Sequence, residues 1–139
     1  MKRFVLDASV ALAWFLDRPT AQYADHVRQL LLRGNRAVVP ALWQLEIANG
    51  FIVAERRGIL NSSDTTEALQ NLEVVIAQAI ENSLDPVSMR GILRTAKEFR
   101  LTAYDAVYLD TALRQELPLA TLDRQLLTAA SRAGVEILS

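Results

Sequence analysis

The chain contains no cysteine and only one histidine, His26, among its 139 residues. The absence of thiols excludes a disulfide framework, a thiolate zinc site and a cysteine nucleophile, and a single imidazole excludes any mechanism that needs two. Glycine and proline are also scarce, with 5 and 4 residues, and 51% of the chain is hydrophobic, which excludes a disordered or low-complexity protein. Acid–base chemistry in this protein would therefore depend on carboxylates.

Neither sign of charge dominates the sequence. Its 15 basic and 16 acidic residues give a net charge of −1. A protein that coats nucleic acid is strongly basic overall, so the composition excludes that class of protein. Only two of the basic residues are lysines, Lys2 and Lys97. Arginine binds phosphate oxygens with a planar fork, so this bias is consistent with phosphate binding and equally with a genomic base composition that favours arginine codons.

Long hydrophobic runs are missing as well. Two positive charges, Lys2 and Arg3, precede a mostly apolar run to Leu16, which has the outline of a secretory signal. Asp7 interrupts this run, and no stretch approaches the roughly 18 apolar residues of a membrane-spanning helix. We therefore expect a cytoplasmic protein without membrane association, formed by a single domain over residues 1–139.

Short β-type runs alternate with helical segments along the chain. Strands are predicted at residues 3–6, 37–39, 117–121 and 135–138, and residues 75–82 are ambiguous between helix and strand. Helices are predicted at residues 8–16, 19–33, 41–57, 61–75, 86–99, 105–116 and 123–133. The alternation predicts the α/β class, a three-layer α/β/α sandwich around a mostly parallel sheet, in which ligands bind beyond the carboxyl ends of the strands.

Four carboxylates are placed where such a sheet binds ligands or where a charge is unexpected. Asp7 and Asp123 each follow a predicted strand, so both are expected at the carboxyl edge of the sheet. Asp105 opens a helix among apolar neighbours, and Glu46 lies in a helix that is apolar on most of its circumference. Asn49 follows three residues later and shares the face of Glu46.

Each of these acids has a simpler explanation when it is taken alone. Asp7, Asp105 and Asp123 could cap the helices that follow them, and Glu46 could pair with a buried arginine. If the four converge, they require a cation, because two unit charges about 4 Å apart repel by roughly 4 kcal/mol at an effective dielectric of 20. With no cysteine and one histidine, an all-oxygen site predicts Mg²⁺ or Mn²⁺, and a water bound to such an ion can attack a phosphodiester.

Four short segments carry these acids in register along the chain, namely VLDAS at 5–9, LEIAN at 45–49, YDAVY at 104–108 and ATLDRQL at 120–126. Together they resemble the PIN-domain ribonucleases, and especially the VapC-like toxins of bacterial toxin–antitoxin modules. The resemblance spans nearly the whole chain and implies a Mg²⁺- or Mn²⁺-dependent endoribonuclease. It also implies that four acids form the catalytic metal site, namely Asp7, Glu46, Asp105 and Asp123.

The same resemblance implies supporting residues around the acids. Ser9 and Thr121 match small hydroxyl positions beside the site, and Asn49 matches a polar position on the glutamate helix. Capping, turn hydrogen bonds and solvation explain these three residues equally well.

Several basic residues are candidates for holding the phosphates of a substrate. They are Arg56, Arg57, Lys97, Arg100 and Arg124. We favour Arg124 for this role because it adjoins Asp123. Solvation at helix ends and ion pairing with nearby acids are the simpler explanation for any one of them.

The resemblance further implies an RNA substrate, a small antitoxin that covers the site, and a toxin homodimer. Two other function classes stay open. A phosphoryl-transfer protein of another α/β class usually carries an acidic pair after the first strand, whereas here Ser9 follows Asp7 by two residues. A non-catalytic binding module of the same PIN-like fold would use its acids as caps and core pairs, and Mn²⁺ would not stabilise it, whereas a metal site predicts stabilisation.

Overall fold

The strands form one parallel sheet whose order reverses beside β1. A computed structural model of the chain describes all 139 residues, and its four paired strands have the order β3-β2-β1-β4. They are β1 (Arg3–Leu6), β2 (Arg36–Val39), β3 (Ile80–Asn82) and β4 (Leu119–Ala120). Because the chain proceeds from β1 through β2 to β3 and then returns to β4, the carboxyl ends of β1 and β4 flank the crevice in which such sheets bind ligands.

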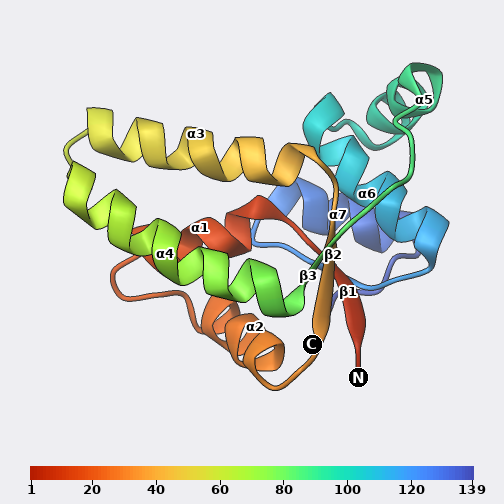
Figure 1. Cartoon of the computed structure of the whole chain (residues 1–139). Helices are drawn as coiled ribbons and strands as arrows, with labels where there is room; N and C mark the ends of the chain where they lie inside the picture. Colours follow the sequence, from red (N-terminus) through yellow and green to blue (C-terminus); the bar gives the residue numbers. More distant parts are fainter.

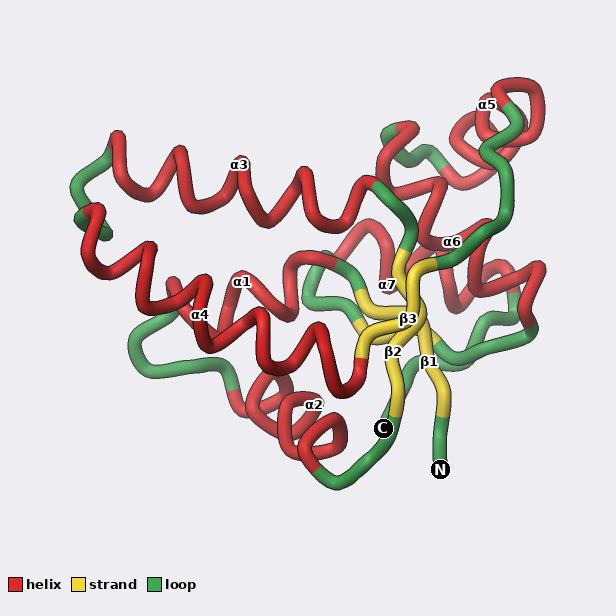
Figure 2. The backbone as a smooth tube through the Cα atoms, in the orientation of Figure 1, coloured by secondary structure: helices red, strands yellow, loops and turns green.

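Seven helices cover the two faces of this sheet. They are α1 (Ala8–Leu16), α2 (Gln22–Leu32), α3 (Leu42–Arg56), α4 (Ser62–Ala79), α5 (Met89–Phe99), α6 (Ala103–Gln115) and α7 (Arg124–Ala133). α1 to α4 lie on one side of the strands and α5 to α7 on the other (Figures 1 and 2). Right-handed crossovers require this division, and it confirms the predicted three-layer sandwich.

The strands are apolar on both faces, as a sheet covered by two helical layers requires. Phe4, Val5 and Leu6 of β1 are fully buried. They belong to a core of 34 buried hydrophobic residues, in which Trp43 and Tyr108 are the largest fully buried side chains. No helix combines the length and the apolar character that crossing a membrane would need.

Most predicted elements are confirmed, and the differences lie mainly at their ends. α5 begins at Met89 rather than residue 86, because the Ser88 hydroxyl accepts the Gly91 N–H and caps the helix there. α6 begins two residues earlier than predicted, because Thr102 is its cap. The ambiguous stretch contains both elements, since α4 continues to Ala79 and β3 follows directly.

Three further predictions need correction. The strand predicted at 117–121 is shortened to β4, because Pro118 has no N–H to donate to a ladder. The strand predicted at 135–138 is reduced to a single parallel bridge between Ile137 and Leu119. α2 begins at Gln22 rather than at residue 19, after the extended backbone of Ala21.

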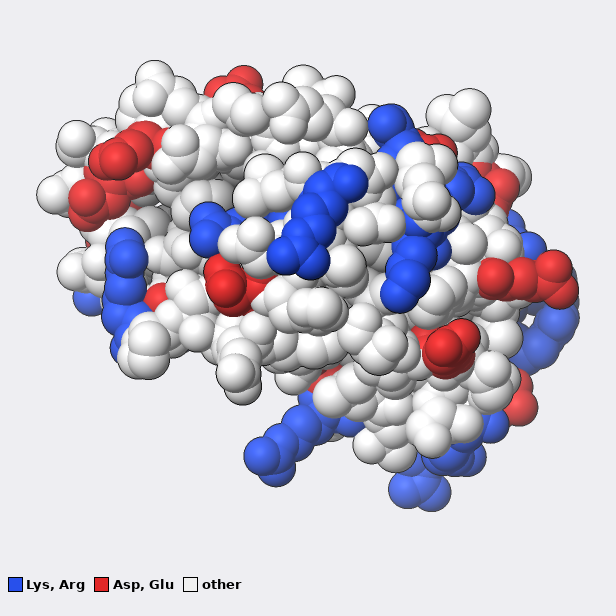
Figure 3. Space-filling view, turned by 90° about the horizontal axis from the view of Figure 1, so that it is seen from below, with Lys and Arg blue, Asp and Glu red and all other residues white.

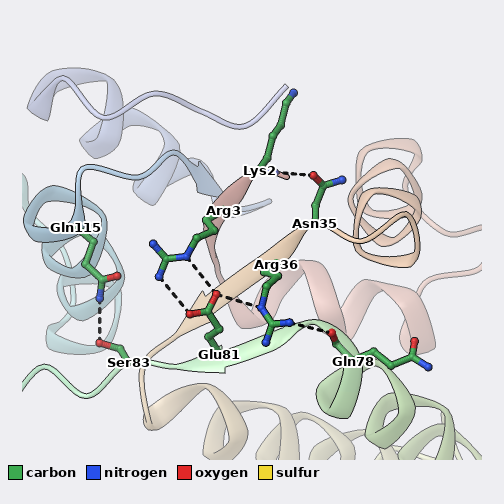
Figure 4. A network of polar contacts seen from close by, with 8 residues as sticks. All are labelled: Lys2, Arg3, Asn35, Arg36, Gln78, Glu81, Ser83 and Gln115. Atoms are coloured by element: carbon green, nitrogen blue, oxygen red, sulfur yellow. Dashed lines mark hydrogen bonds and ion pairs between the residues drawn. The ribbon is translucent and has the colours of Figure 1, made fainter.

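One carboxylate near the amino ends of the strands is neutralised by two arginines. Glu81 of β3 accepts hydrogen bonds from Arg3 Nε and Nη2, both at 3.2 Å, and from Arg36 Nε at 3.3 Å (Figure 4). These guanidinium groups hold the pKa of Glu81 below its usual value. The face seen from below, where the chain termini lie, carries basic and acidic side chains interspersed with each other (Figure 3).

Candidate active site

Asp7 lies at the corner where β1 leads into α1, and its carboxylate is held by two hydroxyl groups. The residue is 4% exposed. Ser9 Oγ and Thr121 Oγ1 each donate a hydrogen bond of 2.7 Å to Asp7 Oδ2. The Asp7 side chain makes no capping hydrogen bond to α1, so the capping explanation is wrong for this residue. Burial raises the pKa of Asp7, although the two hydroxyl donors lower it in part.

Ser9 and Thr121 connect this carboxylate to the chain that follows β4. Ser9 Oγ accepts the backbone N–H of Leu122 at 3.0 Å, and Thr121 Oγ1 accepts that of Asp123 at 3.0 Å. Each hydroxyl therefore donates to Asp7 and accepts from the β4–α7 connection. This geometry ties together the two strand ends that flank the crevice and gives both predicted supporting residues a definite contact.

Asp123 is a helix cap and lies on the same edge of the sheet. Its Oδ1 accepts the backbone N–H of Leu126 at 2.9 Å, which caps α7. The capping explanation therefore holds for Asp123, but it uses only one carboxylate oxygen. Oδ2 accepts no hydrogen bond, so it can still bind a cation.

Glu46 is partnered by a tyrosine rather than by the arginine that its apolar helix suggested. Tyr108 Oη donates a hydrogen bond of 2.6 Å to Glu46 Oε1. Burial raises the pKa of Tyr108, and the Glu46 carboxylate raises it further, so the hydroxyl remains a protonated donor. Burial also raises the pKa of Glu46, and repulsion from Asp7 adds to this effect.

Asp105 is the acid whose ionisation depends most on the other three. Thr102, not Asp105, caps α6, and Asp105 donates its own backbone N–H to that cap at 3.1 Å. The pKa of Asp105 is raised to about 6, first by burial and then by repulsion from Asp123, Asp7 and Glu46. This mutual repulsion shows that the four acids face a common space.

That space is one cavity of about 430 Å³ at the carboxyl edge of the sheet. Its lining includes the four acids together with Ser9, Asn49, Gly50 and Arg57. None of the four acids takes part in an ion pair of the structure. A cavity with four carboxylates and one nearby arginine is therefore not neutralised by the protein itself.

The donor chemistry of the cavity fits a hydrated divalent cation. No three acidic or histidine side chains form a ready-made group that could hold a metal ion. Mg²⁺, however, usually keeps several waters and is held directly by one or two carboxylates, so acids separated by water fit it and Mn²⁺ better than they fit zinc. A cation would also relieve the repulsion that raises the pKa of Asp105.

The structure adds one residue, Tyr108, to the expected set, and among the basic candidates it places Arg57 rather than Arg124 at the cavity. Tyr108 was not expected to have a role, although its spacing of three from Asp105 places both on one face of α6. Arg57 lines the cavity, whereas Arg124, the favoured candidate for phosphate binding, does not. Arg124 is exposed at the start of α7. Sequence adjacency to Asp123 could not reveal this, because the first turn of a helix points successive side chains in different directions.

Comparison with known proteins agrees with this geometry. Among solved structures, the chain is similar to the crystal structure of PAE2754 from Pyrobaculum aerophilum, with a TM-score of 0.69 and 25% sequence identity over 92% of this chain and 79% of that chain. No match is found among curated proteins. The family model of the PIN domain, which generally denotes a metal-dependent nuclease, matches residues 4–131. Because that match runs from the first strand into the last helix, the chain belongs to the PIN-domain family.

Proposed function

We propose that this protein is an endoribonuclease that requires Mg²⁺ or Mn²⁺ and hydrolyses RNA phosphodiesters. The observation that carries the proposal is the single cavity lined by Asp7, Glu46, Asp105 and Asp123, none of which has a cationic partner in the protein. Partly or fully buried carboxylates without a cationic partner destabilise a fold, so a bound divalent cation is the physical reason to keep them.

The residues around the cavity would divide the work of such a site. Asp7 and Glu46 would be the more rigid acids, because hydroxyl donors fix one oxygen of each carboxylate. Asp105 and Asp123 would complete the negative site from the starts of α6 and α7. A bound Mg²⁺ or Mn²⁺ would supply Lewis acidity toward the phosphate and lower the pKa of a coordinated water. Arg57 would counter the charge of the substrate phosphate at the cavity wall.

We further propose that residues 1–139 act as one nuclease domain, that the protein is cytoplasmic, and that it is the toxin of a bacterial toxin–antitoxin module. A small antitoxin and a second copy of the chain are the partners that this role requires. The family match and the four sequence segments support the proposal. An apolar groove of about 310 Å³ between α3 and α4 supports a protein partner, because Ile52 and Leu69 in its lining are 47% and 46% exposed.

One observation favours a second candidate function, a non-catalytic binding module of the same family. The acids do not form a ready-made metal group, as would be expected if Asp123 served only as a cap and Glu46 only as the partner of Tyr108. In that case no cation would bind the folded state more tightly than the unfolded state, and the cavity would serve another purpose.

Thermal unfolding with and without Mn²⁺ distinguishes the two functions. The nuclease site predicts that millimolar Mn²⁺ or Mg²⁺ raises the melting temperature by several degrees, because the ion binds only the folded acids. Asp105→Asn should lose most of this increase, whereas Asp110→Asn, on the same helix but paired with Arg114, should keep it. An unchanged melting temperature for the parent protein would reject the metal site, and RNA cleavage dependent on the same ions would confirm the activity.

A further inference from the structure

α5 carries a stripe of positive charge on its exposed face. Arg90, Arg94 and Lys97 are all exposed, and their spacing places them within about 60° of one another around the helix. The ion pairs of the structure involve Arg3, Arg28, Arg36 and Arg114. The three charges of α5, which we call the α5 stripe, therefore have no acidic partner.

Two exposed apolar side chains accompany the stripe. Met89 is 79% exposed and Leu93 is 53% exposed. Together with the α5 stripe they line a surface hollow of about 560 Å³. The opposite face of α5 buries Ile92 and Thr95 against the rest of the fold. The buried face of α5 therefore contributes to folding. Folding does not explain why the exposed face combines three cations with two apolar side chains.

The α5 stripe lies on the helix that leads directly into α6, one of the elements that form the acidic cavity. α5 is joined to α6, which carries Asp105, by residues 100–102 alone. At the other end, Arg114 of α6 donates to the carbonyl oxygen of Pro86, just before α5, at 3.3 Å. The two helices therefore form a hairpin that is closed at both ends. Along the chain, Lys97 is the member of the stripe nearest to Asp105, and Arg90 is the most distant.

Charge complementarity identifies what such a surface would bind. Carboxylates around a cavity repel a polyanion, so a substrate with a phosphate backbone needs positive charge outside the cavity to remain bound. The α5 stripe extends over about 10 Å, and its arginines suit the tetrahedral phosphate group. Exposed apolar groups beside the cations can pack against sugars or unstacked bases, which a stripe of charge alone could not do.

We propose that the α5 stripe binds the backbone of the RNA substrate beyond the scissile phosphate. This inference rests on the proposed ribonuclease function and extends it. The protein would then prefer RNAs long enough to occupy the cavity and α5 together over short oligonucleotides. The surface contributes affinity and register, and it carries no reacting group.

Binding of RNA in EDTA tests the stripe without any cleavage. The probe is a fluorescein-labelled RNA hairpin of about 24 nucleotides, long enough for several phosphate contacts. In the triple variant Arg90→Ala, Arg94→Ala and Lys97→Ala, we expect binding about tenfold weaker and a slope of log K against log salt reduced by about 2. Alanine favours helix formation, so α5 should remain folded.

The matched control removes the same number of lysine and arginine charges from another part of the molecule. Lys2→Ala, Arg28→Ala and Arg33→Ala replace two arginines and one lysine on the β1 and α2 side, and binding should change by less than about twofold. Equal losses in the two triple variants would overturn the proposal, because net charge alone would then explain them. Unchanged binding in the α5 variant would also overturn it.

Two further measurements separate this inference from its rivals. Vesicles of phosphatidylglycerol and phosphatidylcholine test an anionic membrane as the ligand, and loss of vesicle binding with unchanged RNA binding in the α5 variant would overturn the RNA assignment. A parent protein that binds the hairpin through α5 but cleaves no RNA with Mn²⁺ would refute the ribonuclease function and leave the RNA contact intact. Cleavage that favours the hairpin over a tetranucleotide in the parent, but not in the α5 variant, would support both.

Discussion

Carboxylates at the two ends of the sheet have pKa values shifted in opposite directions. Near the amino ends of the strands, Glu81 receives hydrogen bonds from Arg3 and Arg36, and its pKa is lowered. At the carboxyl ends, Asp7 and Asp105 are partly or fully buried without an arginine, and their pKa values are raised. The same chemical group, a carboxylate, is therefore stabilised in its charged form at one end and destabilised in that form at the other.

This difference separates a structural carboxylate from a functional one. The unfavourable repulsion among the acids at the carboxyl edge does not come from a shortage of basic residues. The chain has 15 basic residues, and two of them pair with Glu81. Proteins retain carboxylates in such unfavourable electrostatic environments at sites where a bound ligand supplies the missing favourable interaction. Charge balance in the folded protein is thus a better guide to the site than the number of acids.

The largest difference between the two edges of the sheet is expected in the rate of RNA cleavage. Asp7→Asn should reduce Mn²⁺-dependent RNA cleavage by more than about 100-fold, because it removes a charge from the metal site while the amide keeps the shape of the side chain. Glu81→Gln, the matched change at the amino edge, should leave the rate within about twofold. Cleavage of a labelled RNA by both purified variants measures the contrast. Equal rates for the two variants would remove Asp7 from the site.

A smaller effect is expected when the hydrogen bond to Glu46 is removed. Tyr108→Phe deletes the 2.6 Å contact with Glu46 Oε1, and the affinity for Mn²⁺ should fall by about tenfold because a ligand loses its orientation. The control is Thr111→Val on the same helix, which deletes a buried hydroxyl bonded to the Val107 carbonyl at 2.8 Å. Both changes should cost about 1 kcal/mol of stability. Only Tyr108→Phe should weaken Mn²⁺ binding in calorimetry, and a similar loss in both variants would indicate a purely structural role.

The pH dependence of stability should have opposite signs at the two ends. The pKa of Asp105 rises from 3.8 in the unfolded chain to about 6 in the folded protein, so its stabilising contribution is complete below pH 3.8 and is lost as the pH rises through about 6. The lowered pKa of Glu81 gives a contribution that is present above pH 4.5 and is lost as the pH falls through its folded value.

Urea unfolding in EDTA can isolate the carboxyl edge. Between pH 7 and pH 5 the metal-free protein should gain about 1 kcal/mol, a value reduced for the partial solvent exposure of Asp105. Asp105→Asn should flatten this dependence, and Mg²⁺ should oppose it by favouring the charged form. The same gain in Asp105→Asn as in the parent would assign the effect to another group.

The smallest effect is expected when the ion pairs at the amino edge of the sheet are weakened, and it concerns stability alone. Arg36→Ala removes one of the two guanidinium groups on Glu81, but Arg3 remains and both arginines are substantially exposed. The loss of stability should be below about 1 kcal/mol, and it should shrink further in high salt. Thermal unfolding at low and high salt checks both points. A loss of several kcal/mol would mean that this network is as critical as the acidic cavity.

The sequence predicted much of the fold because its signals are local. Buried runs such as residues 4–6 and 37–39 are apolar on both faces, which is typical of parallel strands. Element ends were predicted less well where two local signals compete, as at α5, where the Ser88 cap outweighed Pro86. Regular structure depends on near neighbours, and a cap is a contact over three residues.

The candidate site was predictable as a set of residues but not as a network. Asp7 and Asp123 follow strands, and that position alone indicated the carboxyl edge. The bond from Thr121 to Asp7 spans 114 residues and the bond from Tyr108 to Glu46 spans 62. No local pattern encodes such contacts, because they form only when the strand order brings distant segments together.

The sequence by itself determined the α/β class, because strand and helix patterns are local. It also determined the kind of ligand the acids can bind, because no cysteine and a single histidine leave oxygen atoms as the available donors. The tertiary structure decided which acids are held by hydroxyl groups, which one caps a helix, and which basic residue lines the cavity. The physical reason is that packing sets the distances between side chains, and those distances set burial, repulsion and hydrogen bonding.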